Sequence, residues 1–123
     1  MEFKKWLEQA LEDLDTAKVN LNAEKYYASV LFCEQAVEKA LKALWLKEKP
    51  EDIPFTHDLT LLGKKLNLPK EFFITFKELT SSYTETRYPD MSDVMPSKKF
   101  QKKDALKYVN SADEIIKWIK KKI

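Results

Sequence analysis

The sequence predicts an all-α fold: an up-and-down antiparallel bundle of four to five helices, which we expect to form a homodimer. Apolar residues recur at alternating steps of three and four along most of the chain, the spacing of an amphipathic helix. No segment has the pattern of a strand, and one Gly in the whole chain argues against tight hairpins. The length of 123 residues favours one domain spanning residues 1–123.

Two helices are expected in the first 50 residues. The first carries an apolar seam at heptad spacing, formed by Phe3, Leu7, Ala10, Leu14, Ala17 and Leu21. The second should run from about Tyr26 to about Lys49, before Pro50 and Pro54. It is apolar over about half of its circumference, which predicts a place in the middle of the bundle. So wide an arc exceeds what one small bundle covers, and we therefore expect dimerisation through this helix or its neighbours.

Three more helices are expected in the rest of the chain. Thr56 should cap a short third helix, and Pro69 should open the fourth at its first position. The fourth helix should end at Tyr88-Pro89-Asp90, and residues 88–101 lack periodicity. The last helix should begin near Lys102 or Lys103, with a heptad-like seam of Ala105, Val109, Ala112, Ile116, Ile119 and Ile123.

Composition excludes several classes of function. A single Gly excludes Gly-rich phosphate loops, and a single Cys excludes an internal disulfide. The net charge of +2 is too balanced for an evident nucleic-acid footprint. The acidic, amphipathic start is unlike a secretory signal, and no apolar run is long enough to cross a bilayer. We therefore expect a cytoplasmic protein with no membrane association and no cofactor.

Metal and nucleophile chemistry have weak support in the sequence. Glu34 and Glu38 share one face of the second helix, but the spacing offers them no His partner, so we expect structural acids and no metal site. Cys33 lies on the apolar line of the same helix, where a thiol behaves as a small buried hydrophobe. His57 is expected in the first turn of the third helix, as a capping or packing residue.

Arg87 is the most distinctive candidate for binding. It is the only Arg beside 21 Lys, and it continues the apolar stripe of the fourth helix, formed by Phe72, Phe76, Leu79 and Tyr83. A planar guanidinium next to an aromatic ring can hold a phosphate while the ring stacks on a base. The alternative is that Arg87 packs its stem on the core and keeps its head in water.

Three stretches of the chain together carry a family resemblance. They are ASVLFCEQAVEKALKAL at residues 28–44, THDL at 56–59 and TRYPD at 86–90. In order and spacing they resemble the HEPN domain family, small helical domains named for higher eukaryotes and prokaryotes and for proposed nucleotide binding. The resemblance extends over nearly the whole chain, and it implies a bundle of four or five helices that commonly dimerises.

The resemblance also implies a function. Many HEPN domains are partners of small nucleotidyltransferases in toxin–antitoxin-like modules, so a nucleotidyltransferase, a nucleotide or RNA are the implied partners. Arg87 and Tyr88, with Asp90 in the same segment, would contact phosphate and base, and His57 and Asp58 would shape the wall of the site. The residues that would line the nearby groove or lock the dimer are Gln35, Glu38, Lys39 and Lys42.

The chain departs from the ribonuclease members of that family. In those proteins an Arg is followed, after roughly four to six residues, by a His that moves protons. The corresponding positions after Arg87 hold Ser92, Asp93 and Val94. We therefore expect a member without the usual ribonuclease motif. Two alternatives stay open: a metal-independent ribonuclease that uses Arg87 with a displaced His57, and a dimeric interaction module without a ligand.

Overall fold

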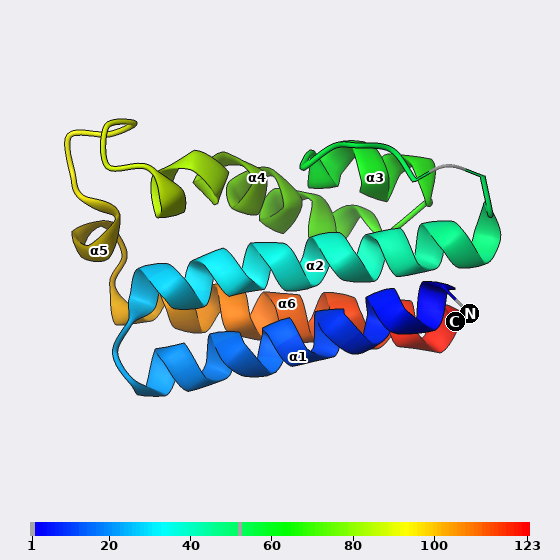
Figure 1. Cartoon of the computed structure of the whole chain (residues 1–123), viewed down its shortest axis with the longest axis horizontal. Coiled ribbons are helices and arrows are strands. Elements are labelled where there is room, and N and C mark those ends of the chain that lie inside the picture. The colour runs from blue at the N-terminus through cyan, green and yellow to red at the C-terminus, as the bar shows by residue number, and fades with distance from the viewer. Residues whose placement is uncertain (1, 52) are drawn as a thin grey trace.

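The computed structural model describes residues 2–51 and 53–123, and within them it contains helices and no strand. The long helices are α1 (Glu2–Asn22), α2 (Tyr26–Glu48), α4 (Phe73–Arg87) and α6 (Lys102–Lys122), shown in Figure 1. The short ones are α3 (Leu59–Lys65), the 3₁₀ turn η1 (Lys70–Phe72) and α5 (Pro96–Lys99). The five predicted helices are all present, and α5 is an additional turn inside the aperiodic segment 88–101.

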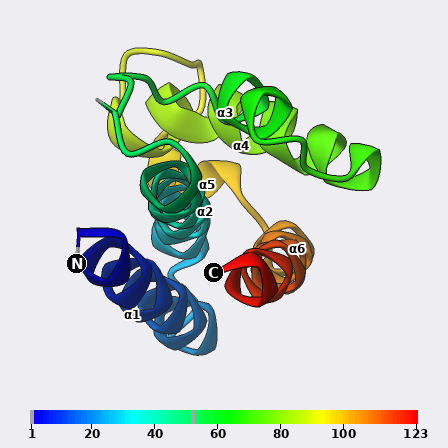
Figure 2. The ribbon, with the colours of Figure 1, turned by 90° about the vertical axis from the view of Figure 1, so that its right-hand side faces the viewer.

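Helix α2 is the central element of the bundle. Seen end-on, α1 and α6 lie on one side of it and α3 and α4 lie on the other (Figure 2). It runs antiparallel to α1 and α4 and parallel to α6, and it contacts each of them (Figure 1). The predicted central position of this helix is confirmed. Its apolar arc is buried by the chain's own helices, so homodimerisation stays a prediction without that support.

Two of the predicted helix starts are wrong. Asp58, not Thr56, caps α3, because its side chain accepts a hydrogen bond from the Leu61 N–H at 3.2 Å. Thr56 instead accepts the N–H of Asp58 at 3.0 Å, in the turn before the helix. Pro69 precedes η1 rather than opening α4, because a 3₁₀ turn with a Phe72 N–H bond to the Pro69 carbonyl comes first.

The segment before α3 is held over the middle of α2. The Leu59 N–H at the start of α3 donates to Thr80 Oγ1 on α4 at 3.1 Å. Further along α3, the buried Gly63 lies directly against the ring of Phe76. These contacts dock α3 on α4 and bring His57, two residues before α3, over α2. Among the residues described, no helix combines the length and the apolar character that a membrane span needs.

Candidate functional site

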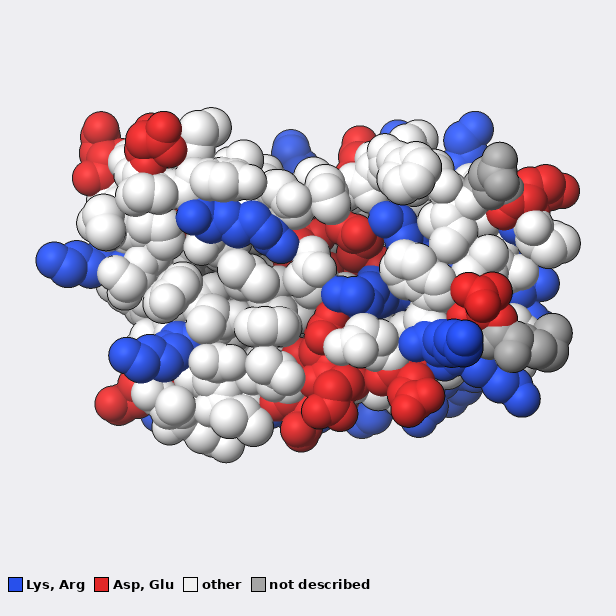
Figure 3. Space-filling model, in the orientation of Figure 1, with Lys and Arg blue, Asp and Glu red and all other residues white. Residues whose placement is uncertain are grey.

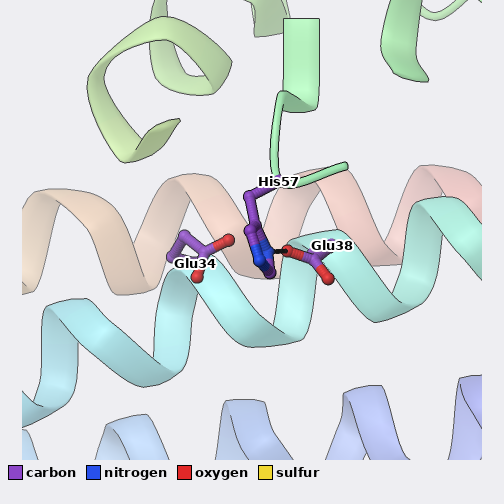
Figure 4. Close-up of side chains that lie close together, drawn as sticks. All are labelled: Glu34, Glu38 and His57. Carbon is purple, nitrogen blue, oxygen red and sulfur yellow. Dashed lines mark hydrogen bonds and ion pairs between the residues drawn. The ribbon is translucent and has the colours of Figure 1, made fainter. Parts of the chain in front are cut away.

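Polar side chains gather where α2, the segment before α3 and the end of α4 meet. Glu34 and Glu38 lie one turn apart on α2, and the His57 ring lies against α2 beside them (Figure 4). Tyr83 and Arg87 reach the same place from the last turns of α4. In the space-filling view, acidic and basic atoms intermingle in the middle of the face shown in Figure 3.

Glu34 is the most buried member of this cluster, with a side chain 0% exposed. Its Oε1 accepts hydrogen bonds from Gln35 at 2.9 Å and from the Arg87 guanidinium at 3.4 Å. Its Oε2 has no hydrogen-bond partner among the described residues. Burial raises the pKa of Glu34 to about 7, and the nearby Glu38 adds to that rise. Protonated and charged forms of Glu34 are therefore both populated near neutral pH.

Glu38 is charged and fixes the neighbouring imidazole. Burial alone would raise the pKa of Glu38, but hydrogen bonds from His57 and Lys42 outweigh burial and hold it below its usual range. Glu38 Oε1 lies 2.7 Å from His57 Nδ1, and Oε2 accepts from Lys42 Nζ at 2.9 Å. A carboxylate at Nδ1 favours the tautomer with the proton on Nδ1, which leaves the lone pair on Nε2. The His57 side chain is 52% exposed, so this ring is open to solvent.

Tyr83 joins His57 to Arg87. The His57 and Tyr83 rings stack with centroids 4.2 Å apart, and the Arg87 guanidinium carbon lies 3.8 Å from the centroid of Tyr83. Arg87 also donates to the Tyr83 carbonyl at 3.0 Å. The Arg87 side chain is only 19% exposed, so its head is held in the cluster rather than extended into water. The structure therefore places His57 and Arg87 against the same ring, that of Tyr83.

A second row of polar contacts leads from this cluster to α1. Lys39 Nζ donates to Gln35 Oε1 at 3.0 Å and to Asp13 Oδ2 at 2.6 Å. Gln35 with Lys39 and Glu38 with Lys42 are each four residues apart on α2, and both pairs are hydrogen-bonded. The hydrogen bonds run without a break from Asp13 on α1, across α2, to Arg87 on α4.

The structure gathers some of the predicted site residues and not others. Those brought together are Arg87, His57, Gln35, Glu38, Lys39 and Lys42. Tyr88 is exposed just beyond α4, and Asp90 is exposed in the loop that follows. Asp58 is engaged as the cap of α3. The predicted character of Cys33 is confirmed, because it is fully buried, and burial raises its pKa to about 12.

Two members of the cluster were not predicted from the sequence, and the contact of a third, His57, with an acid of α2 was not expected. Glu34 and Tyr83 were not among the candidates, although each lies four residues before one of them, Glu38 and Arg87 respectively. The expectation that the two acids lack a His partner is wrong, because His57 reaches Glu38 across a loop. A search by helical spacing cannot find a partner supplied by another segment, which is the physical reason for this error.

The fold and the site define a small helical-bundle domain in which a buried carboxylate pair, an imidazole and a guanidinium share one polar cluster. The chain belongs to the HEPN domain family, whose model matches residues 3–123. The solved structures of this fold include TT1696 from Thermus thermophilus, 26% identical, with a TM-score of 0.91 over 98% of each chain. They also include ST0689, an archaeal HEPN homologue, 28% identical, with a TM-score of 0.82 over 96% of this chain and 94% of that one. Among curated proteins, none gives a significant match.

Proposed function

We propose that this HEPN domain binds a nucleotide or a segment of RNA through the surface formed by Arg87, Tyr83 and His57. The observation that carries this proposal is the packing of the guanidinium and the imidazole against one tyrosine ring. Arg87 donates hydrogen bonds to two protein oxygens, those of the Tyr83 carbonyl and the Glu34 carboxylate. A guanidinium carries more N–H groups than these two bonds use. The remaining donors suit phosphate oxygens, and the exposed Tyr88 ring next to Arg87 suits a base.

The charges around Arg87 are compatible with an anionic ligand. Glu38 is paired with Lys42, and Asp13 is paired with Lys39, so neither acid faces the site unneutralised. Glu34 is partly protonated near neutral pH because burial raises its pKa to about 7. The positive charge of Arg87 therefore has only a partial counter-charge, and a phosphate can supply the rest.

A thermal-shift experiment tests this proposal. The ligands are ATP, GTP, AMP and a short single-stranded RNA, measured on wild type, Arg87→Ala and Lys107→Ala. A ligand at a hundred times its dissociation constant should stabilise the fold by about 2.7 kcal/mol, a rise of several degrees in Tm. The rise should vanish in Arg87→Ala and persist in Lys107→Ala, which removes the same charge at a surface ion pair. No rise with any ligand would favour the interaction module instead.

A second candidate function is metal-independent cleavage of RNA, favoured by the contact between Glu38 and His57. With its proton held on Nδ1, His57 can accept the proton of a ribose 2′-OH at Nε2. The 2′ oxygen then attacks phosphorus, a cyclic phosphate forms, and the 5′ oxygen leaves and takes a proton from water. Arg87 would stabilise the charge on the phosphate oxygens. Labelled RNA in EDTA should be cut by wild type and not by His57→Ala or Arg87→Ala, and a 2′-deoxy substrate should stay intact. Uncut RNA with wild type would exclude this function.

We also propose a protein partner, either a second copy of the chain or a small nucleotidyltransferase in a toxin–antitoxin-like module. Large apolar side chains are exposed in the segment that follows Arg87, namely those of Tyr88, Met91, Val94 and Met95. Exposed apolar side chains that cluster in this way are typical of interaction surfaces. Sedimentation at tens of micromolar should show the dimer mass, and Met91→Ser with Met95→Ser should reduce it. A monomer would contradict the homodimer, and the same runs with nucleotidyltransferases of the same genome would then test the other partner.

A further inference from the structure

We propose that Glu34, Glu38 and His57 form a binding site for a first-row divalent cation such as Mn²⁺ or Zn²⁺. Each residue offers one ligand atom, and the three atoms all lie within 4.8 Å of one another. Ligand atoms around such a cation lie at about 2.0–2.2 Å from it, so small side-chain shifts would bring the three onto one ion. We infer this cation site from the distances among the three residues, and it does not depend on nucleotide binding.

The two carboxylates are already oriented by other side chains. Glu34 Oε1 is held by Gln35 and Arg87, and Glu38 Oε2 is held by Lys42. Glu34 Oε2 is left without a partner, and Glu38 Oε1 faces His57 Nδ1 at 2.7 Å. A cation bound between Oε1 and Nδ1 would replace the proton that these two atoms share in its absence. Hydrogen bonds to the outer atoms of metal ligands fix ligand orientation in the same way in known metal sites.

The unpartnered Oε2 of Glu34 is a second indication that a ligand binds here, separate from the grouping of the acids. Its Oε2 is buried and makes no hydrogen bond to any described residue, although the side chain is 0% exposed. A buried carboxyl oxygen without a partner is unfavourable, because it has lost its hydrogen bonds to water and gained none in the protein. Figure 4 shows the Glu34 carboxylate beside the His57 ring. A proton shared with Glu38 or a bound cation would each satisfy this oxygen, and a cation engages all three side chains at once.

The chemistry of the ligands selects the class of cation. One imidazole nitrogen with two carboxylate oxygens suits Mn²⁺ or Zn²⁺, whereas Ca²⁺ takes six to eight oxygens. The half-exposed His57 leaves one side of the cluster open to water, which would complete the coordination shell. Arg87 and Lys42 lie beside the site and oppose a second positive charge, so we expect micromolar rather than nanomolar affinity.

The single His of the chain makes a direct test simple. Chelator-treated protein without a polyhistidine tag is titrated with Mn²⁺ while the imidazole resonances are followed by NMR, and with Zn²⁺ in a calorimeter. The His57 resonances should broaden at Mn²⁺ concentrations that leave distant signals sharp, and Zn²⁺ should bind once per chain. Glu34→Gln and His57→Ala should each weaken Zn²⁺ binding at least tenfold. Glu12→Gln, which removes one exposed acid of α1, should leave it unchanged.

Two results would overturn the proposal. One is the absence of both heat and selective broadening at millimolar metal. The other is Zn²⁺ binding that Glu34→Gln and His57→Ala leave at wild-type strength, which would place the ion elsewhere on the surface. Circular dichroism confirms folding of each variant, and His57→Ala keeps the test available if Glu34→Gln does not fold, because His57 is half-exposed. Nucleotide shifts are measured separately in EDTA, so a failure of the proposed function is distinguishable from a failure of this one.

Discussion

Replacing Gly63 by Ala should destabilise the protein, which is the opposite of the usual effect of this substitution inside a helix. Ala is favoured over Gly in a helix interior by about 1 kcal/mol. A Cβ at position 63 would lie 2.5 Å from Phe76 Cε2 and 3.0 Å from its Cδ2. Phe76 is fully buried in the core, so its ring has little room to move away.

The magnitude follows from these two opposing effects. Adding a methyl group to a packed core costs about 1–3 kcal/mol, and the upper end applies because 2.5 Å lies far inside van der Waals contact. After subtraction of the helix preference, the net loss is about 2 kcal/mol. For a chain of this length that corresponds to a fall in Tm of roughly 8 °C.

Urea unfolding and thermal scans measure this loss, and a double-mutant cycle identifies its cause. In Gly63→Ala with Phe76→Leu the ring edge is gone and only the helix preference for Ala remains, so the double variant should be about 3 kcal/mol more stable than the sum of the single effects. Lys64→Ala, an exposed neighbour on α3, should change stability by less than about 0.5 kcal/mol. A Gly63→Ala variant as stable as wild type, or more stable, would refute the packing argument.

Three further predictions concern buried polar groups. The raised pKa of Glu34, about 7 in the fold, means that the folded chain holds this proton better than the unfolded chain. In EDTA the wild-type free energy of unfolding should therefore fall by about 3 kcal/mol at most as pH rises from about 4.5 to 7, and Glu34→Gln should abolish the fall; parallel profiles would count against this. Burial raises the pKa of the Cys33 thiol to about 12, so iodoacetamide should label it only in unfolding concentrations of urea, and rapid labelling of native protein would contradict this. Ser29 Oγ donates to the Ala17 carbonyl at 2.8 Å, so Ser29→Ala should cost about 1 kcal/mol in urea unfolding, and an unchanged midpoint would contradict the contribution of that bond.

Long helices were predictable from the sequence because their burial is periodic. The expected span of the second helix, Tyr26 to about Lys49, differs by one residue from α2 at Tyr26–Glu48. Helix α6 begins at Lys102, one of the two expected positions. Short elements were not predictable, because the four residues of α5 and the three of η1 are too few to show a period.

The candidate site was only partly predictable, for a different reason. Arg87 could be found because it continues the buried stripe of its own helix, a property of local sequence. The contact of His57 with Glu38 depends on the path of the loop before α3, which the hydrogen bond from Leu59 to Thr80 holds in place. Such tertiary contacts are not encoded in the spacing of residues along one helix. For the same reason, the contact of Glu34 with Arg87 was not predictable, and the sequence indicates only a structural acid at Glu34.

The polar row from Asp13 to Arg87 has a consequence for the alignment of the helices. Heptad seams repeat, so α1 could slide along α2 by two turns and still pair apolar residues with apolar residues. Asp13 is buried and bonded to Lys39 at 2.6 Å, and after such a slide both charges would lose their partner. Buried charges without partners are strongly unfavourable. The contacts that form the site therefore also fix the register of α1 against α2. The apolar seams alone would allow more than one register.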